Sequence, residues 1–250
     1  MTDGVTASPV EATDRDGRHR ERTLLVALLA LGPVLYSTWL LGWFLSSHLD
    51  QSRAYASELA ALDQPWGLFY RTGDLLTGIV LTAAALLALW LRPRRPLTTV
   101  GWVGLGVFAV ATILDSRMPL DCAAHASAAC AAREQAGLLD ESRFLHASTS
   151  TIAATAAAVS VFAFIVASFR YDWPRWTRWG GLAVVVTYLV GNAWTLFAID
   201  MDGRGDEVWL LGYAQRLQLV AVTGWLVYLA LIAAWERRTG FHVKRSTPCG

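Results

Sequence analysis

Charged residues are scarce in this chain. Asp, Glu, Lys and Arg make up 16% of its 250 residues, whereas hydrophobic residues make up 54%. Ordinary soluble domains are about 25% charged, so this composition argues against a soluble domain. The net charge is only +1, and no basic stripe with interleaved aromatic residues occurs. Nucleic acid is therefore not an expected partner.

Cysteine is also rare, and the residues that usually signal thiol or metal chemistry are not grouped. The chain has three cysteines, Cys122, Cys130 and Cys249, and it has no Cys-x-x-Cys pair, which a thiol oxidoreductase is expected to show. The Asp and His residues near Cys122 match no zinc-binding spacing. Nothing resembles the nucleophile elbow of a serine hydrolase. We therefore expect neither a metal nor another cofactor.

Long apolar runs, by contrast, are abundant. A bilayer core about 30 Å thick needs about 20 apolar residues per spanning helix. Six stretches qualify, approximately 23–47, 68–91, 97–115, 146–169, 178–200 and 208–235. They predict an all-α polytopic membrane protein, a bundle of six transmembrane helices within residues 23–237. The polar segments 1–22 and 238–250 are interpreted as tails, the first of them disordered.

The distribution of basic residues predicts the orientation of the bundle. Arg and Lys cluster in four segments, 15–22, 92–95, 170–178 and 237–245, and such residues favour the cytoplasmic side of a membrane. Both termini are therefore expected in the cytoplasm, and the protein is expected in a bacterial plasma membrane. The connections that then face outward are 48–67, 116–145 and 201–207.

The longest outward connection contains two of the cysteines. Cys122 and Cys130 are separated by seven residues and lie on the side of the membrane that is oxidising in most bacteria. We expect a disulfide that restrains the loop by limiting its unfolded conformations. Thiol chemistry or metal capture by the same pair is the alternative.

Ionisable residues inside the predicted spans lie close to the outward side. Arg71 and Asp74 are three residues apart at the start of the second span, so they share a helix face. Asp115 ends the third span and His146 begins the fourth. Charged groups are costly inside a membrane, so we expect each of them to be paired with another group or to have a functional role.

The last two spans add polar residues at the same depth. Asn192 lies in the outer part of the fifth span, and Gln215 and Arg216 lie in the outer part of the sixth. The cytoplasmic half of the bundle is almost purely apolar. This asymmetry predicts a polar pocket that opens outward.

Three interpretations of these residues are open. In the first, Arg71–Asp74 and Arg216–Asp115 are structural ion pairs that tie helices together. In the second, Arg71 and Arg216 clamp an anionic lipid headgroup or a small polar ligand. The further ligand-binding candidates are Gln215 and Asn192.

In the third interpretation the pocket is catalytic. His146 acts as a general base, and Asp74 or Asp115 orients it or acts as an acid. A nucleophile comes from Ser148 or Ser150. The catalytic candidates are thus His146, Asp74 and Asp115.

Three sequence blocks resemble one bacterial membrane-protein family. They are SELAALDQPWGLFYRTGDLLTG (57–78), LDSRMPLDCAAHASAACAAREQAGLLDESRFLHASTSTIAA (114–154) and GYAQRLQL (212–219). They are similar, in the same order, to the second span, the Pro-Leu-Asp-Cys loop with its following helix, and the final span of the "domain of unknown function 998" family (DUF998). The resemblance covers about residues 25–237. It implies a six-span membrane protein and carries over no general biochemical activity.

We therefore expect a non-enzymatic integral membrane protein that binds a lipid headgroup or a membrane protein partner at an outward polar pocket. The alternative is a membrane-embedded lipid-modifying enzyme, a hydrolase or transferase, that uses His146 with Asp74 or Asp115. The two differ in what His146 contributes, because a catalytic site needs it for turnover and a binding site does not.

Overall fold

The computed structural model describes residues 9–45, 49–91, 95–204 and 210–239, and within these ranges every regular element is a helix. The expected all-α fold is therefore confirmed. The α-helices are α1 (Pro9–Tyr36), α2 (Gly67–Leu91), α3 (Pro96–Arg117), α4 (Ala128–Gln135), α5 (Asp140–Arg170), α6 (Arg175–Gly203) and α7 (Leu211–Thr239). Two 3₁₀ segments, η1 (Ser37–Trp43) and η2 (Ala56–Ala60), lie between α1 and α2.

All the α-helices except α4 are long and apolar enough to cross a membrane, α1 together with η1. Their bounds agree with the expected spans to within a few residues for α2 and α3. Helices α5, α6 and α7 extend further, because their polar ends continue the helix beyond the apolar run. Both the number of spans and their order are therefore as the apolar runs predicted.

The first span differs from its prediction at both ends. Helix α1 begins at Pro9, so part of the segment interpreted as a disordered tail is helical. That segment is polar, but residues 9–22 include four Arg and two Glu, which favour helix. At the other end, residues 37–43 form the 3₁₀ segment η1 instead of continuing the α-helix. The tighter winding follows Pro33, which cannot donate a backbone hydrogen bond within the helix.

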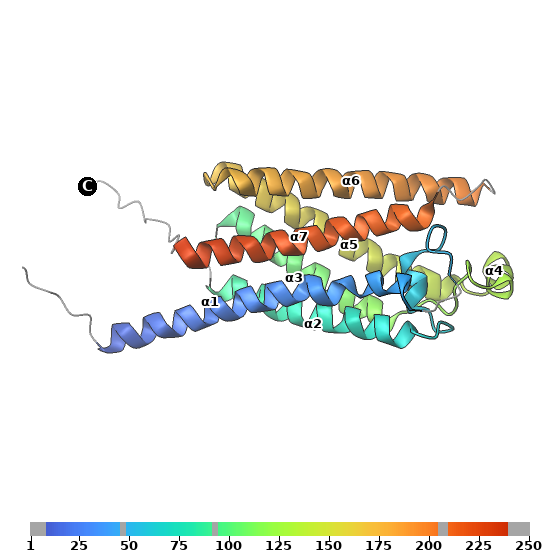
Figure 1. The fold of residues 1–250 in the computed structure, drawn as a ribbon, viewed down its shortest axis with the longest axis horizontal. Coiled ribbons are helices and arrows are strands. Elements are labelled where there is room, and N and C mark those ends of the chain that lie inside the picture. Colours follow the sequence, from blue (N-terminus) through green and yellow to red (C-terminus); the bar gives the residue numbers. More distant parts are fainter. Residues whose placement is uncertain (1–8, 46–48, 92–94, 205–209, 240–250) are drawn as a thin grey trace, which may run out of the picture.

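The six long helices form a closed ring. Each packs against the next long helix in the chain, and α7 returns to pack against α1. Figure 1 shows that η2, α4 and the connection between α1 and α2 gather at one end of the bundle, opposite the start of α1 and the end of α7. We call this the α4 end. Neither η2 nor α4 was predicted from the sequence.

Aromatic side chains fill the middle of the ring. Trp102 and Phe164 pack edge to face with their ring centroids 4.9 Å apart, and Phe108 and Trp225 do so at 5.1 Å. All four are nearly inaccessible to solvent. This apolar core closes the interior of the bundle beneath the α4 end.

Small residues allow neighbouring helices to approach closely. A Cβ atom at Gly78 of α2 would lie 2.7 Å from the carbonyl oxygen of Ala109 in α3. At Gly104 of α3 it would lie 2.9 Å from the Cβ atom of Ser160 in α5. Backbone approach of this kind is typical of helix packing in membranes, where lipid supplies no hydrophobic drive for association.

Candidate ligand-binding site

A cavity of about 180 Å³ lies inside the ring near the α4 end. Its walls come from α1, η1, η2, α2, α3, α5 and α7, so it forms only where these elements meet. Apart from its aromatic residues, the polar residues that line it are Thr38, Ser57, Arg71, Asp74, Thr112, Asp115, Ser116, His146, Ser150, Gln215 and Gln218. Five of the seven candidate binding and catalytic residues are therefore brought to one place, together with the nucleophile candidate Ser150.

Among the charged side chains of the cavity, Asp115 has the most interaction partners. It lies near the end of α3, and its Oδ1 accepts hydrogen bonds from the hydroxyls of Thr149 and, at 2.9 Å, Ser150 on α5. His146, one turn earlier on α5, places Nδ1 3.3 Å from the same oxygen. Nδ1 also lies 3.3 Å from the carbonyl oxygen of Met118. The predicted association of His146 with Asp115 is thus present, and hydroxyl donors orient the carboxylate.

Asp74 is in a different situation. It lines the cavity, yet no residue of the described ranges hydrogen-bonds to it or pairs with it. The expected ion pair with Arg71 is wrong. Arg71 instead donates through Nη1 to the carbonyl oxygens of Ala60, at 2.6 Å, and Ala61, at 3.4 Å.

The physical reason lies in the direction of the arginine side chain. Side chains on a helix tilt toward its N-terminus, and Arg71 is only one turn from the start of α2. The guanidinium therefore reaches the carbonyl groups at the end of η2 before it can turn toward Asp74. Both residues face the cavity, but their charges remain apart.

The second expected ion pair, between Arg216 and Asp115, is also wrong. Arg216 is only 4% exposed, and its Nη1 donates to the carbonyl oxygens of Gln51 at 2.9 Å, Ala54 at 3.1 Å and Gly212 at 2.9 Å. Its Nη2 bonds to the side-chain oxygen of Gln51. It does not line the cavity. Arg216 therefore anchors the α1–α2 connection to the start of α7.

The predicted amide residues divide between the cavity wall and the layer behind it. Gln215 lines the cavity and accepts a hydrogen bond from the backbone N–H of Ala56 in η2. Asn192 does not line it. Asn192 accepts a hydrogen bond from Gln218 at 2.9 Å and donates to the carbonyl oxygen of Tyr188 at 2.8 Å, so it holds a residue of the wall in place.

Aromatic residues complete the wall, and the sequence did not single them out as site residues. Tyr36, Trp39, Tyr70 and Phe108 line the cavity. Trp39 is buried, and within the described ranges its indole N–H has no hydrogen-bond partner. The spacing of Tyr36 and Trp39, three residues apart at the end of the first span, is the signal that places both on one face.

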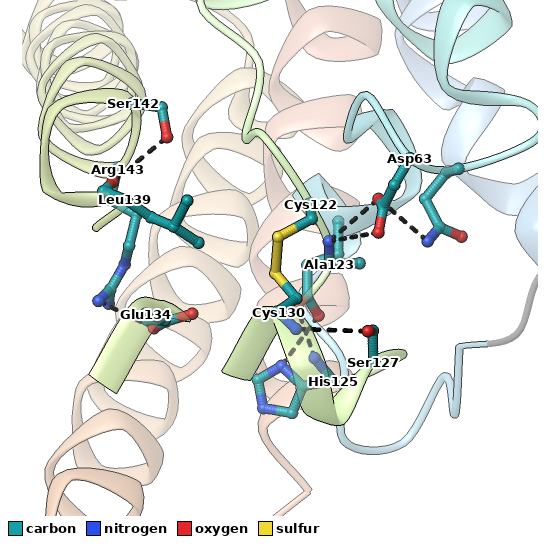
Figure 2. Close-up of a disulfide and its surroundings, with 12 residues drawn as sticks. Asp63, Cys122, Ala123, His125, Ser127, Cys130, Glu134, Leu139, Ser142 and Arg143 are labelled. Atoms are coloured by element: carbon teal, nitrogen blue, oxygen red, sulfur yellow. Dashed lines mark hydrogen bonds and ion pairs between the residues drawn. A yellow bond between two sulfur atoms is a disulfide. The ribbon is translucent and has the colours of Figure 1, made fainter. Parts of the chain in front are cut away.

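The expected disulfide joins Cys122 to Cys130, with their Cα atoms 6.0 Å apart. Figure 2 shows how hydrogen bonds fix this loop around it: Asp63 accepts from the N–H of Ala123 at 3.1 Å, and Ser127 accepts from the N–H of Cys130 at 3.3 Å. The disulfide therefore belongs to an ordered loop at the α4 end of the bundle.

A buried glutamate connects this loop to the cavity wall. Glu58 of η2 is 2% exposed and accepts from the backbone N–H of His125 at 3.1 Å and of Tyr55 at 3.1 Å. The Nδ1 atom of His125 lies 2.9 Å from the same carboxylate. Because Ala56, Ser57 and Ala60 of η2 line the cavity, the disulfide loop braces one of its walls.

The cavity brings charged side chains of both signs together with a histidine. Arg71 supplies a permanent positive charge, and Asp74 and Asp115 supply two carboxylates in different surroundings. His146 and Asp115 together can move a proton. Within the residues that the structure describes, the Ser150 hydroxyl donates to Asp115 and not to His146, which differs from the serine–histidine bond of a catalytic triad.

Six long apolar helices in one ring define a multi-pass integral membrane protein. The chain matches a family model described as "Protein of unknown function (DUF998)" over residues 29–232, and it belongs to that family. The resemblance of the three sequence blocks is thereby confirmed. No curated protein and no solved structure gives a significant match.

Proposed function

We propose that this protein binds the polar headgroup of a membrane lipid in the cavity at the α4 end. The single observation that carries the proposal is that a cavity inside a membrane-spanning ring is lined by a cation, a histidine and two carboxylates. One carboxylate, Asp74, has no partner in the described part of the chain. Asp74 is partly buried, and a carboxylate without a partner inside a membrane is costly, so a cationic group of a bound ligand would stabilise it.

A lipid is the ligand that the position of the cavity favours. Its polar lining comes from residues close to the ends of α2, α3 and α7, where a membrane helix approaches the headgroup layer. Below it lies the aromatic core around Trp102 and Trp225. A headgroup can enter at this level while its acyl chains stay in the bilayer.

The proposal places the α4 end on the outer face of a plasma membrane. Basic residues at the other end of the bundle support this orientation, since they favour the cytoplasm. They include Arg18, Arg20, Arg22, Arg95, Arg170, Arg175, Arg178, Arg237 and Arg238. The disulfide at the α4 end agrees with an oxidising compartment there.

Filling the cavity tests the proposal. Ala153 of α5 lines the cavity, and Ala147 of the same helix is exposed on its outer surface. Protein purified in mild detergent is expected to retain a stoichiometric lipid, detected by native mass spectrometry. Ala153→Phe should lose this lipid, because the ring occupies the space of the headgroup, and Ala147→Phe should keep it. Equal lipid content in all three proteins would contradict the proposal.

Lipid modification is the second candidate, and the 3.3 Å approach of His146 to Asp115 favours it. The same purification separates the two functions through His146→Gln. If the protein only binds, the retained lipid is the same species in wild type and His146→Gln. If the protein is an enzyme, His146→Gln retains a substrate that differs in mass from the lipid on the wild type.

A further inference from the structure

Two opposite charges stand apart in the same cavity wall. Arg71 and Asp74 are three residues apart on α2, and both line the cavity. At this spacing, opposite charges on a helix normally attract each other. Here no ion pair joins them, because the guanidinium is fixed to the carbonyl oxygens of Ala60 and Ala61. The wall therefore presents a separated positive and negative charge.

The positive group retains donors for a ligand. Arg71 uses Nη1 for the two carbonyl groups. No hydrogen bond from its Nη2 or Nε occurs within the residues that the structure describes. A guanidinium is permanently charged and matches phosphate or carboxylate oxygens. An anionic group is thus the expected neighbour of Arg71.

The negative group calls for a cation. Asp115 already receives two hydroxyl donors and the imidazole of His146, whereas Asp74 receives none from the described chain. The rings of Tyr36, Trp39 and Phe108 line the same cavity, and aromatic faces attract ammonium groups. An ammonium group is therefore the complement of Asp74.

We infer that the cavity takes a zwitterionic headgroup, in which a phosphate faces Arg71 and a nearby ammonium faces Asp74. This inference rests on the proposed function and names its ligand class. A purely anionic headgroup would leave Asp74 unpaired and would add a negative charge beside Asp115. The cavity of about 180 Å³ is smaller than the ~300–1,000 Å³ of pockets that enclose drug-sized ligands, so it suits a headgroup and not a whole lipid.

A lipid competition measures this preference directly. Purified, delipidated protein is mixed with equal amounts of phosphatidylethanolamine and phosphatidylglycerol of the same acyl chains, and bound species are counted by native mass spectrometry. Wild type should favour the ethanolamine lipid about tenfold, which corresponds to ~1.4 kcal/mol. Asp74→Asn should bring the ratio close to one, because the amide has no charge to pair with ammonium.

Two further variants assign the effect to the two charges. Arg71→Lys keeps a cation in the wall, so it should keep the preference while binding both lipids more weakly. Asp121→Asn changes an exposed carboxylate outside the cavity and should leave the ratio as in wild type. Thermal unfolding of Asp74→Asn checks that it is folded. An unchanged ratio in Asp74→Asn, or a wild-type preference for phosphatidylglycerol, would overturn the zwitterion inference.

The arms of the experiment separate this inference from the proposed function. If wild type binds no more of either lipid than Ala153→Phe does, lipid binding itself fails. Soluble phosphoethanolamine serves as a competitor and distinguishes a lipid from a free zwitterion. Displacement of bound lipid by it is expected if both share the site. Binding of phosphoethanolamine without any lipid would keep the headgroup chemistry and overturn the lipid as its source.

Discussion

At the scale of single residues, Arg216 makes the strongest prediction on stability. Replacing it with Ala removes the guanidinium that donates to the carbonyl oxygens of Gln51 and Ala54. A buried acceptor left unsatisfied costs about 1–3 kcal/mol, so we expect the free energy of unfolding to fall by about 3 kcal/mol. Thermal unfolding in detergent, followed by circular dichroism, measures the loss as a lower Tm.

Arg204 provides the matched control. It pairs with Asp200 at 2.7 Å, but both side chains are more than half exposed, and exposed ion pairs contribute little. Arg204→Ala should therefore unfold at the wild-type Tm. If Arg216→Ala also unfolds there, the anchoring role of Arg216 is wrong.

The contrast between Arg216 and His146 shows what sequence can predict about a residue. His146 and Asp115 were recognised as a possible pair because each is an ionisable side chain of a kind that associates. The partners of Arg216 are backbone carbonyl groups, which every residue carries, so no residue type in the sequence points to them. The sequence offered Asp115 as the partner of Arg216 because their charges are opposite, and this prediction was wrong.

At the scale of helices, the close contact between α2 and α3 can be tested with two glycines. A Cβ atom at Gly78 would lie 2.5 Å from Cγ1 of Ile113, and the nearby carbonyl of Ala109 cannot move aside. We expect Gly78→Ala to destabilise the protein by about 1–3 kcal/mol, as overpacking does. The same loss should appear as a lower Tm in detergent.

Gly106 of α3 separates this clash from the general effect of adding a methyl group. A Cβ atom there meets only the Cβ atom of Ala85, at an ordinary 3.6 Å. Because Ala favours helix more than Gly does, Gly106→Ala should match or exceed the wild-type Tm. A similar change in both variants would mean that the helices are not held at the described separation.

The six long helices could be predicted from the sequence, whereas the short helical segments could not. The six spans followed from apolar runs, because the thickness of a bilayer sets a length that a sequence must meet. The segments η1, η2 and α4 were not predicted. They are short and take their stability from contacts distant in sequence, such as the bond between Gln215 and Ala56. The aromatic residues of the cavity were also missed, because they come together only through contacts between segments that are distant in sequence.

At the scale of the whole molecule, the orientation of the ring in the membrane is the property to test. Single cysteines introduced at exposed positions of the two ends report it, in a Cys249→Ser background that removes the third native cysteine. Gln135→Cys, at the α4 end, should react with an impermeant maleimide added to intact cells. Asp172→Cys, between α5 and α6, should react only after lysis.

These positions leave the basic residues unchanged, so they do not weaken the signal that sets the orientation. Asp172→Cys removes a negative charge and makes its end of the bundle more positive. The reverse labelling pattern would place the cavity near the cytoplasmic face. The headgroup would then have to come from the inner leaflet.

The closure of the ring through α1 and α7 sets the order in which the protein is completed during synthesis. Chains are made from the N-terminus, so Arg71 and Asp74 enter the membrane well before α7, which contributes Gln215 and Gln218 to the cavity. A nascent chain therefore carries an unpaired carboxylate beside an open seam. Insertion of the final helix closes that seam and completes the cavity in the same step. A chain that is truncated before α7 lacks the Gln215 and Gln218 side of the cavity wall.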